Sequence, residues 1–133
     1  ILAESLRKSK VQPMKIIGVI VPQLAHFYFS SILSGIEEEA SSRGYRLMVA
    51  QSKENYENEV KICRAFSESK VCGIIVSQAK NTTKYDHFQT LLEKGVPLVF
   101  YDRISTGVNA SRVVVDDYMG AFTAVTHLIN IGY

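Results

Sequence analysis

Apolar residues along this chain form two alternating kinds of pattern. Five runs rich in apolar residues have the length of strands: residues 15–21, 45–50, 71–77, 96–101 and 112–115. In four of the segments between or after these runs, apolar residues recur three or four positions apart, which is the spacing of one helix face. The pattern therefore predicts five strands, with helices after the first, second, third and fifth.

The predicted helices are defined by their apolar stripes. These are Phe29, Ile32, Leu33, Ile36 and Ala40; Tyr56, Val60, Cys63 and Phe66; Tyr85, Phe88, Leu91 and Leu92; and Met119, Phe122, Val125, Leu128 and Ile129. Gly44, Gly95 and Gly132 supply helix stops. Asp116 is placed to cap the last helix. The acidic residues of the segment 54–59 suit the positive end of the second helix dipole.

Strands that alternate with helices of this length imply right-handed crossovers and a parallel sheet covered on both faces. We therefore predict an α/β fold with a five-stranded parallel sheet, in the order that is usual for five such units, 2-1-3-4-5. In that order the winding reverses between the first and third strands. Ligands of such sheets bind outside the carboxyl ends of the strands at that reversal.

Several chemically distinctive side chains follow the carboxyl ends of the predicted strands. Aromatic faces suit the C–H side of a sugar or a purine ring, and an Asp-Arg pair can hydrogen-bond a polyhydroxylated or heterocyclic ligand. The candidate ligand-binding residues are His26, Tyr28, Phe29, Gln78, Asp102 and Arg103, with Gln78 chosen from its position alone. Two alternatives stay open: Phe29 also fits the inner helix stripe, and Asp102 and Arg103 could form an ordinary loop salt bridge.

Signals for catalysis are weak. No glycine-rich phosphate loop follows the first strand, and no Ser or Cys stands in a nucleophile-elbow sequence. His26, His87 and His127 are too scattered for a metal-site spacing, and His127 is expected to be structural. We predict a binding module with no catalytic residues, no metal site and no cofactor.

Composition refines this picture. With 133 residues, 47% hydrophobic and 21% charged, the chain suits one globular domain, and no apolar run is long enough to span a membrane. Residues 1–15 hold four basic residues against one acidic residue, a net charge of +3, which leaves −1 for the remainder of the total of +2. A basic leader is either a solvated tail or a segment that contacts phosphates.

Cys63 and Cys72 have no disulfide or metal spacing, which favours reduced thiols and an intracellular protein.

Six segments in register resemble the lactose-repressor (LacI/GalR-type) family of transcriptional regulators. They are "AESLR" (3–7), "IIGVIVP" (16–22), "HFYFSSILSGIEEEASSRGY" (26–45), "VCGIIVS" (71–77), "GVPLVFYDR" (95–103) and "VVVDDYMGAFTAVTHLINIGY" (113–133). The resemblance implies a hinge helix and linker at 1–13 and the N-terminal lobe of a periplasmic-binding-protein-like effector domain at 14–133. The family's DNA-binding headpiece and C-terminal lobe are absent from these residues.

The same resemblance assigns roles to individual residues. It places effector contacts on Tyr28, Phe29, Asp102 and Arg103. His26 and Phe27 stand where the family often has Asn and Pro, which suggests an unusual effector. In the hinge, Leu6 matches the family's intercalating leucine, a wedge between base steps of the minor groove, and Arg7 would contact phosphates.

These expectations together describe part of a cytoplasmic, effector-responsive repressor. A sugar or related small molecule would close the two lobes and change operator affinity, and a pair of hinges on a two-fold DNA site implies a homodimer. No membrane partner is expected. The alternative is a periplasmic sugar-binding protein of an ABC-type transporter, which would share the fold and not bind DNA.

Overall fold

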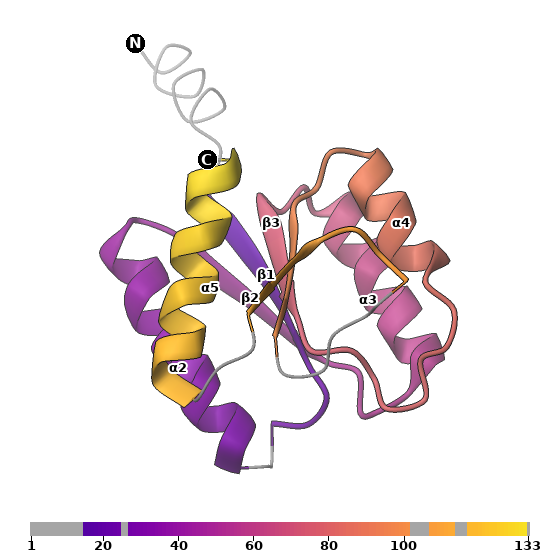
Figure 1. Ribbon diagram of the computed structural model, residues 1–133, viewed down its shortest axis with the longest axis horizontal. Coiled ribbons are helices and arrows are strands. Elements are labelled where there is room, and N and C mark those ends of the chain that lie inside the picture. The colour runs from indigo at the N-terminus through magenta and orange to yellow at the C-terminus, as the bar shows by residue number, and fades with distance from the viewer. Residues whose placement is uncertain (1–14, 25–26, 102–106, 114–116, 133) are drawn as a thin grey trace, which may run out of the picture.

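The computed structural model describes residues 15–24, 27–101, 107–113 and 117–132 (Figure 1). Its elements follow the predicted order, with bounds that differ from the predicted runs by a few residues at most. They are β1 (Ile16–Val21), α2 (Phe27–Ser42), β2 (Arg46–Gln51), α3 (Tyr56–Glu68), β3 (Gly73–Val76), α4 (Asp86–Glu93), β4 (Leu98–Tyr101), β5 (Ser111–Val113) and α5 (Asp117–Gly132).

The strands form one parallel sheet in the order β2-β1-β3-β4-β5. In the central register, Gly18 of β1 pairs with Met48 of β2 on one side and with Ile74 of β3 on the other. The predicted fold class and strand order are therefore confirmed.

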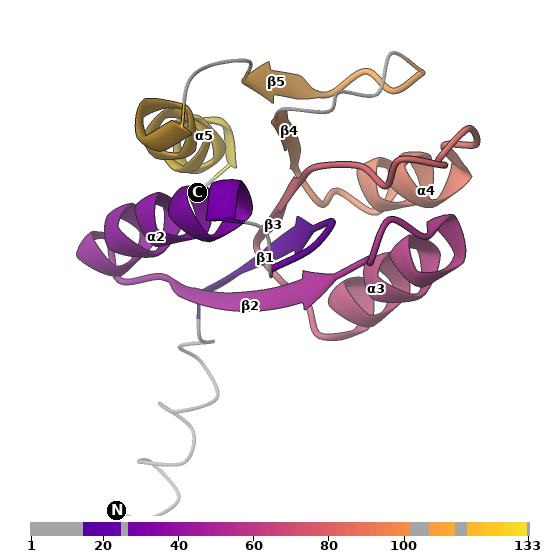
Figure 2. The same ribbon diagram turned by 90° about the horizontal axis from the view of Figure 1, so that it is seen from below.

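Helices cover both faces of the sheet, and successive strand residues point to opposite faces. Figure 2 shows α2 and α5 on one side and α3 and α4 on the other. Along β1, Ile17, Val19 and Val21 join the core under α2 and α5, whereas Ile20 joins the core under α3 and α4. This alternation gives the domain two apolar cores, one for each helical layer.

Helix ends follow the predicted signals. Gly44 has a φ of +80° after α2 and Gly95 a φ of +82° after α4, the left-handed conformation that glycine adopts at helix stops. At the start of α3, the side chain of Asn55 accepts a hydrogen bond from the Asn58 N–H. The predicted cap Asp116 lies outside the described residues.

Candidate functional site

The candidate site lies at the carboxyl rim of the sheet. Because the sheet is parallel, β1 ends at Val21 and β4 ends at Tyr101 on the same edge, with β3 between them. The two segments with the predicted ligand contacts therefore begin from one rim, a single strand apart. This is the position at which open α/β sheets bind ligands.

Several predicted site residues cannot be placed by the structure. His26, Asp102 and Arg103, and the hinge residues Leu6 and Arg7, lie outside the described residues. Tyr28 belongs to the first turn of α2, which begins at Phe27, but its side chain lies outside what the structure describes. The roles assigned to these residues stay predictions.

Phe29 is the one predicted aromatic contact whose surroundings are described. Its side chain is 6% exposed and belongs to the core cluster under α2 and α5, together with Ile32 and Val125. This burial supports the alternative of core packing for Phe29. Its effector role stays a prediction.

Gln78 is the second residue after β3, at the rim, and is half-buried. Its neighbour Ser77 donates its N–H to the Ile20 carbonyl of β1 at 3.1 Å, which extends the β1–β3 pairing beyond the strand. The Gln78 Oε1 atom is buried and has no hydrogen-bond partner among the described residues. Such an acceptor is costly unless a donor reaches it. Gln78 stays a candidate ligand contact on the ground of its position, and its effector role stays a prediction.

A second rim loop is held by β2. The side-chain oxygen of Gln51, the last residue of β2, accepts the Leu24 N–H at 2.9 Å. Ser30 on α2 donates its hydroxyl to the Leu24 carbonyl, also at 2.9 Å. Both hydrogen bonds hold the described part of the β1–α2 connection against its neighbours.

A fully buried carboxylate lies behind the β3–α4 loop. Glu59 on α3 is 0% exposed; its Oε2 accepts the Ala79 N–H at 2.5 Å, and its Oε1 accepts the Thr82 hydroxyl at 2.8 Å. His87 Nε2 on α4 lies 2.7 Å from the same Oε1. The two atoms are within hydrogen-bond distance, and the imidazole donates to the carboxylate in the tautomer that has its proton on Nε2. The network joins α3, the β3–α4 loop and α4.

The sequence analysis did not predict this network, because it interpreted Glu59 only as an acidic residue that suits the positive end of the helix dipole. A signal was present: Glu59 precedes Cys63 by four residues and Phe66 by seven, so all three share one face of α3. The structure buries all three. A carboxylate on a buried helix face predicts partners that donate hydrogen bonds to it.

Two more hydrogen bonds tie the β2–α3 connection to the β3–α4 loop. The Glu54 side chain accepts the Lys80 N–H at 3.0 Å, and the Asn81 side chain accepts the Tyr56 N–H at 2.9 Å. Two adjacent loops at the carboxyl rim therefore support each other.

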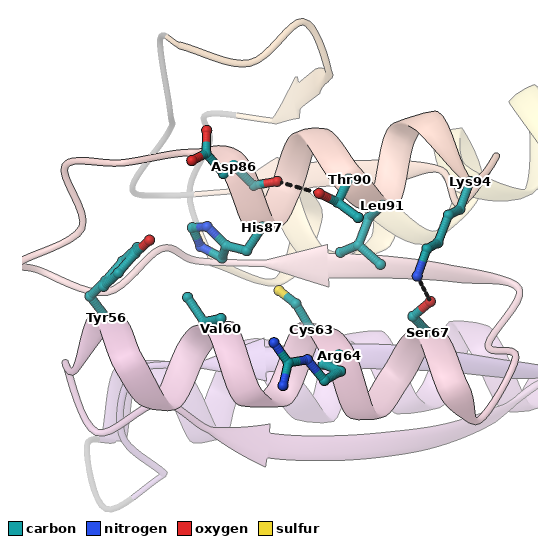
Figure 3. A pocket seen from close by; sticks show the side chains of 10 residues that line it. All are labelled: Tyr56, Val60, Cys63, Arg64, Ser67, Asp86, His87, Thr90, Leu91 and Lys94. Carbon is teal, nitrogen blue, oxygen red and sulfur yellow. Dashed lines mark hydrogen bonds between the residues drawn. The ribbon is translucent and has the colours of Figure 1, made fainter.

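A groove of about 240 Å³ lies between α3 and α4 (Figure 3). The Lys94 ammonium contacts Ser67 Oγ at 3.4 Å at one end, and His87 lies beside Tyr56 towards the other. Its lining residues are Tyr56, Val60, Cys63, Arg64, Ser67, Asp86, His87, Thr90, Leu91 and Lys94. None of the predicted ligand contacts is among them, so this groove is separate from the candidate site.

The cysteines fit the predicted free thiols. Burial, with a smaller contribution from the Glu59 carboxylate, strongly raises the pKa of the Cys63 thiol. Cys63 is therefore protonated and a poor nucleophile at neutral pH.

Within the described ranges, no three His, Cys, Asp or Glu side chains gather as a metal site would require. Among the same residues, no helix is long and apolar enough to cross a membrane.

Comparison with known sequences identifies related proteins. Residues 17–130 match the family model of the periplasmic binding protein domain. The ribose operon repressor of Bacillus subtilis (strain 168) is 30% identical over 129 residues, which cover 97% of this chain and 36% of the repressor. Catabolite control protein A of Priestia megaterium is 28% identical over 117 residues, 88% of this chain and 35% of that protein. The chain thus spans about a third of the length of these relatives.

Solved structures share the fold. The Cra transcriptional dual regulator from Pseudomonas putida, in complex with fructose 1-phosphate, superposes with a TM-score of 0.71 at 23% identity, over 78% of this chain and 38% of that one. A Caulobacter myo-inositol binding protein bound to myo-inositol gives a TM-score of 0.68 at 21% identity, over 76% of this chain and 35% of that one. Both regulators and sugar-binding proteins are therefore structural neighbours, whereas the sequence relatives above are regulators. The resemblance to lactose-repressor-type regulators is confirmed.

Proposed function

The chain belongs to the periplasmic binding protein domain family, and we propose that it is the first lobe of the effector-binding domain of a lactose-repressor-type transcriptional repressor. One observation carries this proposal. The family model begins at residue 17, but the similarity to the ribose operon repressor covers 97% of the chain and so includes much of the leader. A transport protein would have no reason to share a leader with a DNA-binding repressor.

In this proposal, residues 1–13 form the hinge and linker and residues 14–133 form the lobe. A hinge helix of this length is unstable alone, because helix nucleation is costly. It would fold when paired with a second hinge on operator DNA, with Leu6 as the wedge in the minor groove and Arg7 on phosphates. The pairing of two hinges makes the protein a homodimer.

The effector in this proposal is a sugar or a sugar derivative held at the carboxyl rim. Gln78 supports it by its position in the loop that follows β3 at this rim. Tyr28, His26, Asp102 and Arg103 follow the neighbouring strands at the same rim and would complete the contacts. Effector binding would shift the population between two lobe arrangements and thereby change operator affinity.

The test uses the complete protein, a DNA library to select its operator, and D-ribose as the first probe. We expect selective DNA binding that D-ribose or another sugar changes by about fivefold or more, the usual range of allosteric coupling. Leu6→Ala should weaken specific operator binding, and Gln78→Ala should weaken sugar binding with little change in DNA affinity without sugar.

The alternative is a periplasmic sugar-binding protein, which the shared fold of the myo-inositol binding protein favours. The same experiment separates the two functions. Sugar binding without any selective DNA binding would support the transport alternative and overturn the repressor proposal. Selective DNA binding that no sugar changes would overturn the proposed effector class.

A further inference from the structure

Gln78 is held between two hydrogen bonds that reach different parts of the fold. On one side, the Ser77 N–H donates to the Ile20 carbonyl of β1 at 3.1 Å. On the other side, the Ala79 N–H donates to the carboxylate of Glu59 on α3 at 2.5 Å. The backbone position of Gln78 therefore depends on Glu59 as well as on the sheet.

Glu59 binds the loop at more than one point. The Thr82 hydroxyl donates to Glu59 Oε1. The Thr82 N–H donates to the Ala79 carbonyl at 3.1 Å. Residues 79–82 thus form a turn whose two ends both donate to the same carboxylate. His87, from the first turn of α4, approaches Oε1 from a third direction.

Because Glu59 and its partners are buried, they stabilise one conformation of the β3–α4 loop over others. Glu59 is 0% exposed, Thr82 5% and His87 8%. A buried carboxylate is strongly destabilising unless donors surround it. If the loop moved away, Glu59 would lose two of these three donors and water would have to replace them. The loop therefore has a strong energetic reason to stay where it is.

We infer that Glu59 is a positioning residue for effector binding: it holds the β3–α4 loop so that Gln78 is preorganised at the carboxyl rim. This inference rests on the proposed function, because Gln78 matters only if the rim binds an effector. Glu59 acts through the loop and does not touch the ligand. Preorganisation of a polar contact raises affinity by removing the cost of ordering it during binding.

The first test is amide hydrogen exchange by NMR on the full 133-residue chain. Glu59→Ala should accelerate exchange of the Ala79 amide about tenfold or more relative to core amides such as Ile20, because its hydrogen bond is lost. Thr82→Val removes one donor with little change of shape and should give a smaller acceleration. Glu57→Ala, a change at an exposed position of the same helix, is the control and should leave Ala79 unchanged.

Glu59→Gln is the conservative rescue. Its amide oxygen can accept the Ala79 N–H while its NH₂ group donates to Thr82 and to the other tautomer of His87. The Ala79 amide should then exchange within about tenfold of the wild-type rate. Unchanged Ala79 exchange in Glu59→Ala, or an equal acceleration of Ala79 and Ile20, would overturn the inference, because Glu59 would then be only a general stability residue.

The second test is a double-mutant cycle on the complete protein, with D-ribose as the calorimetric probe. Glu59→Ala should weaken D-ribose binding about tenfold when Gln78 is present and much less in the Gln78→Ala background. Equal losses in both backgrounds would overturn the link to Gln78. If D-ribose does not bind the wild type, the choice of effector fails, but the exchange measurements still decide whether Glu59 holds the loop.

Discussion

The ring of Phe66 on α3 lies directly against the backbone of Gly18 in the middle of β1. A Cβ atom built on Gly18 would come within 2.5 Å of Phe66 Cδ2 and 2.7 Å of its Cε2. Phe66 is 3% exposed and packs in the core under α3 and α4. The absence of a side chain at Gly18 therefore lets α3 approach the sheet closely.

Gly18→Ala should destabilise the domain by about 1–3 kcal/mol, the usual cost of overpacking a dense core. Urea unfolding of the variant measures this loss. Phe66→Leu frees space beside the new methyl group, so the double variant Gly18→Ala, Phe66→Leu should lose less than the sum of the two single changes. Strictly additive losses would show that the two positions are not in steric contact.

Loss of His87 leaves the buried Glu59 without one donor. We expect His87→Ala to destabilise the domain by about 2–4 kcal/mol, since it removes both a hydrogen bond to a buried carboxylate and the ring packed on Phe88. His127→Ala is the matched control: His127 Nε2 contacts Ser111 Oγ at 2.8 Å, but the residue is exposed. Its loss should stay near 0.5 kcal/mol. Similar unfolding midpoints for the two variants would contradict a structural role for the Glu59–His87 pair.

The fold was predictable because its determinants are repeated along the chain. The three central strands, β1, β3 and β4, bury apolar residues on both faces, and this requirement produces the continuous runs that reveal them. The edge strands β2 and β5 are more exposed. The order 2-1-3-4-5 is a usual one for five strand–helix units, so its prediction needs no information about individual contacts. Gly44 and Gly95 also predicted the ends of α2 and α4. Both residues adopt the left-handed conformation, which strongly favours glycine.

The site was less predictable because its determinants are single contacts between distant segments. Nothing in the local pattern around Ala79 indicates that its N–H donates to a residue 20 positions earlier. Phe29 illustrates the opposite difficulty: its position suits both a rim contact and the helix stripe, and only three-dimensional packing shows that it is buried. Periodicity predicts which face is inside, but it does not predict which loop closes over a polar group there.

The two cysteines should differ in reactivity. Cys63 is buried and the pKa of its thiol is raised, whereas Cys72 is half-buried. We expect iodoacetamide at pH 7.5 to modify Cys72 in preference to Cys63, with Cys63 reacting only as the domain unfolds. Peptide mass spectrometry of the labelled native and urea-unfolded protein measures this. Equal labelling of both thiols in the native state would contradict the buried environment of Cys63.

The Cys63 thiol also makes the stability of the folded domain depend on pH in the alkaline range. In the unfolded chain the Cys63 thiol ionises near its ordinary pKa of about 9, whereas in the folded domain the raised pKa keeps it protonated. The folded state then binds more protons, so stability falls as pH rises above about 9, with a slope of up to about 1.4 kcal/mol per pH unit from this group. Cys63→Ala should reduce the slope measured by urea unfolding between pH 8.5 and 10. An unchanged slope would assign the alkaline loss to other groups.

Two consecutive residues after β2 adopt the left-handed conformation, Lys53 with a φ of 55° and Glu54 with a φ of 61°. This conformation costs a residue with a side chain about 1–2 kcal/mol of stability. Glycine avoids that cost, but its greater conformational freedom in the unfolded chain lowers stability by about 0.5–1 kcal/mol. Lys53 is exposed, so Lys53→Gly should raise stability by about 0.5 kcal/mol.

Glu54→Gly relieves the same strain but removes the acceptor of the Lys80 N–H, so it should be about 1 kcal/mol less stable than Lys53→Gly. Urea midpoints of the two variants, with equal slopes, measure the difference. Equal stability of both variants would show that the Glu54–Lys80 hydrogen bond contributes nothing to the joining of the two loops.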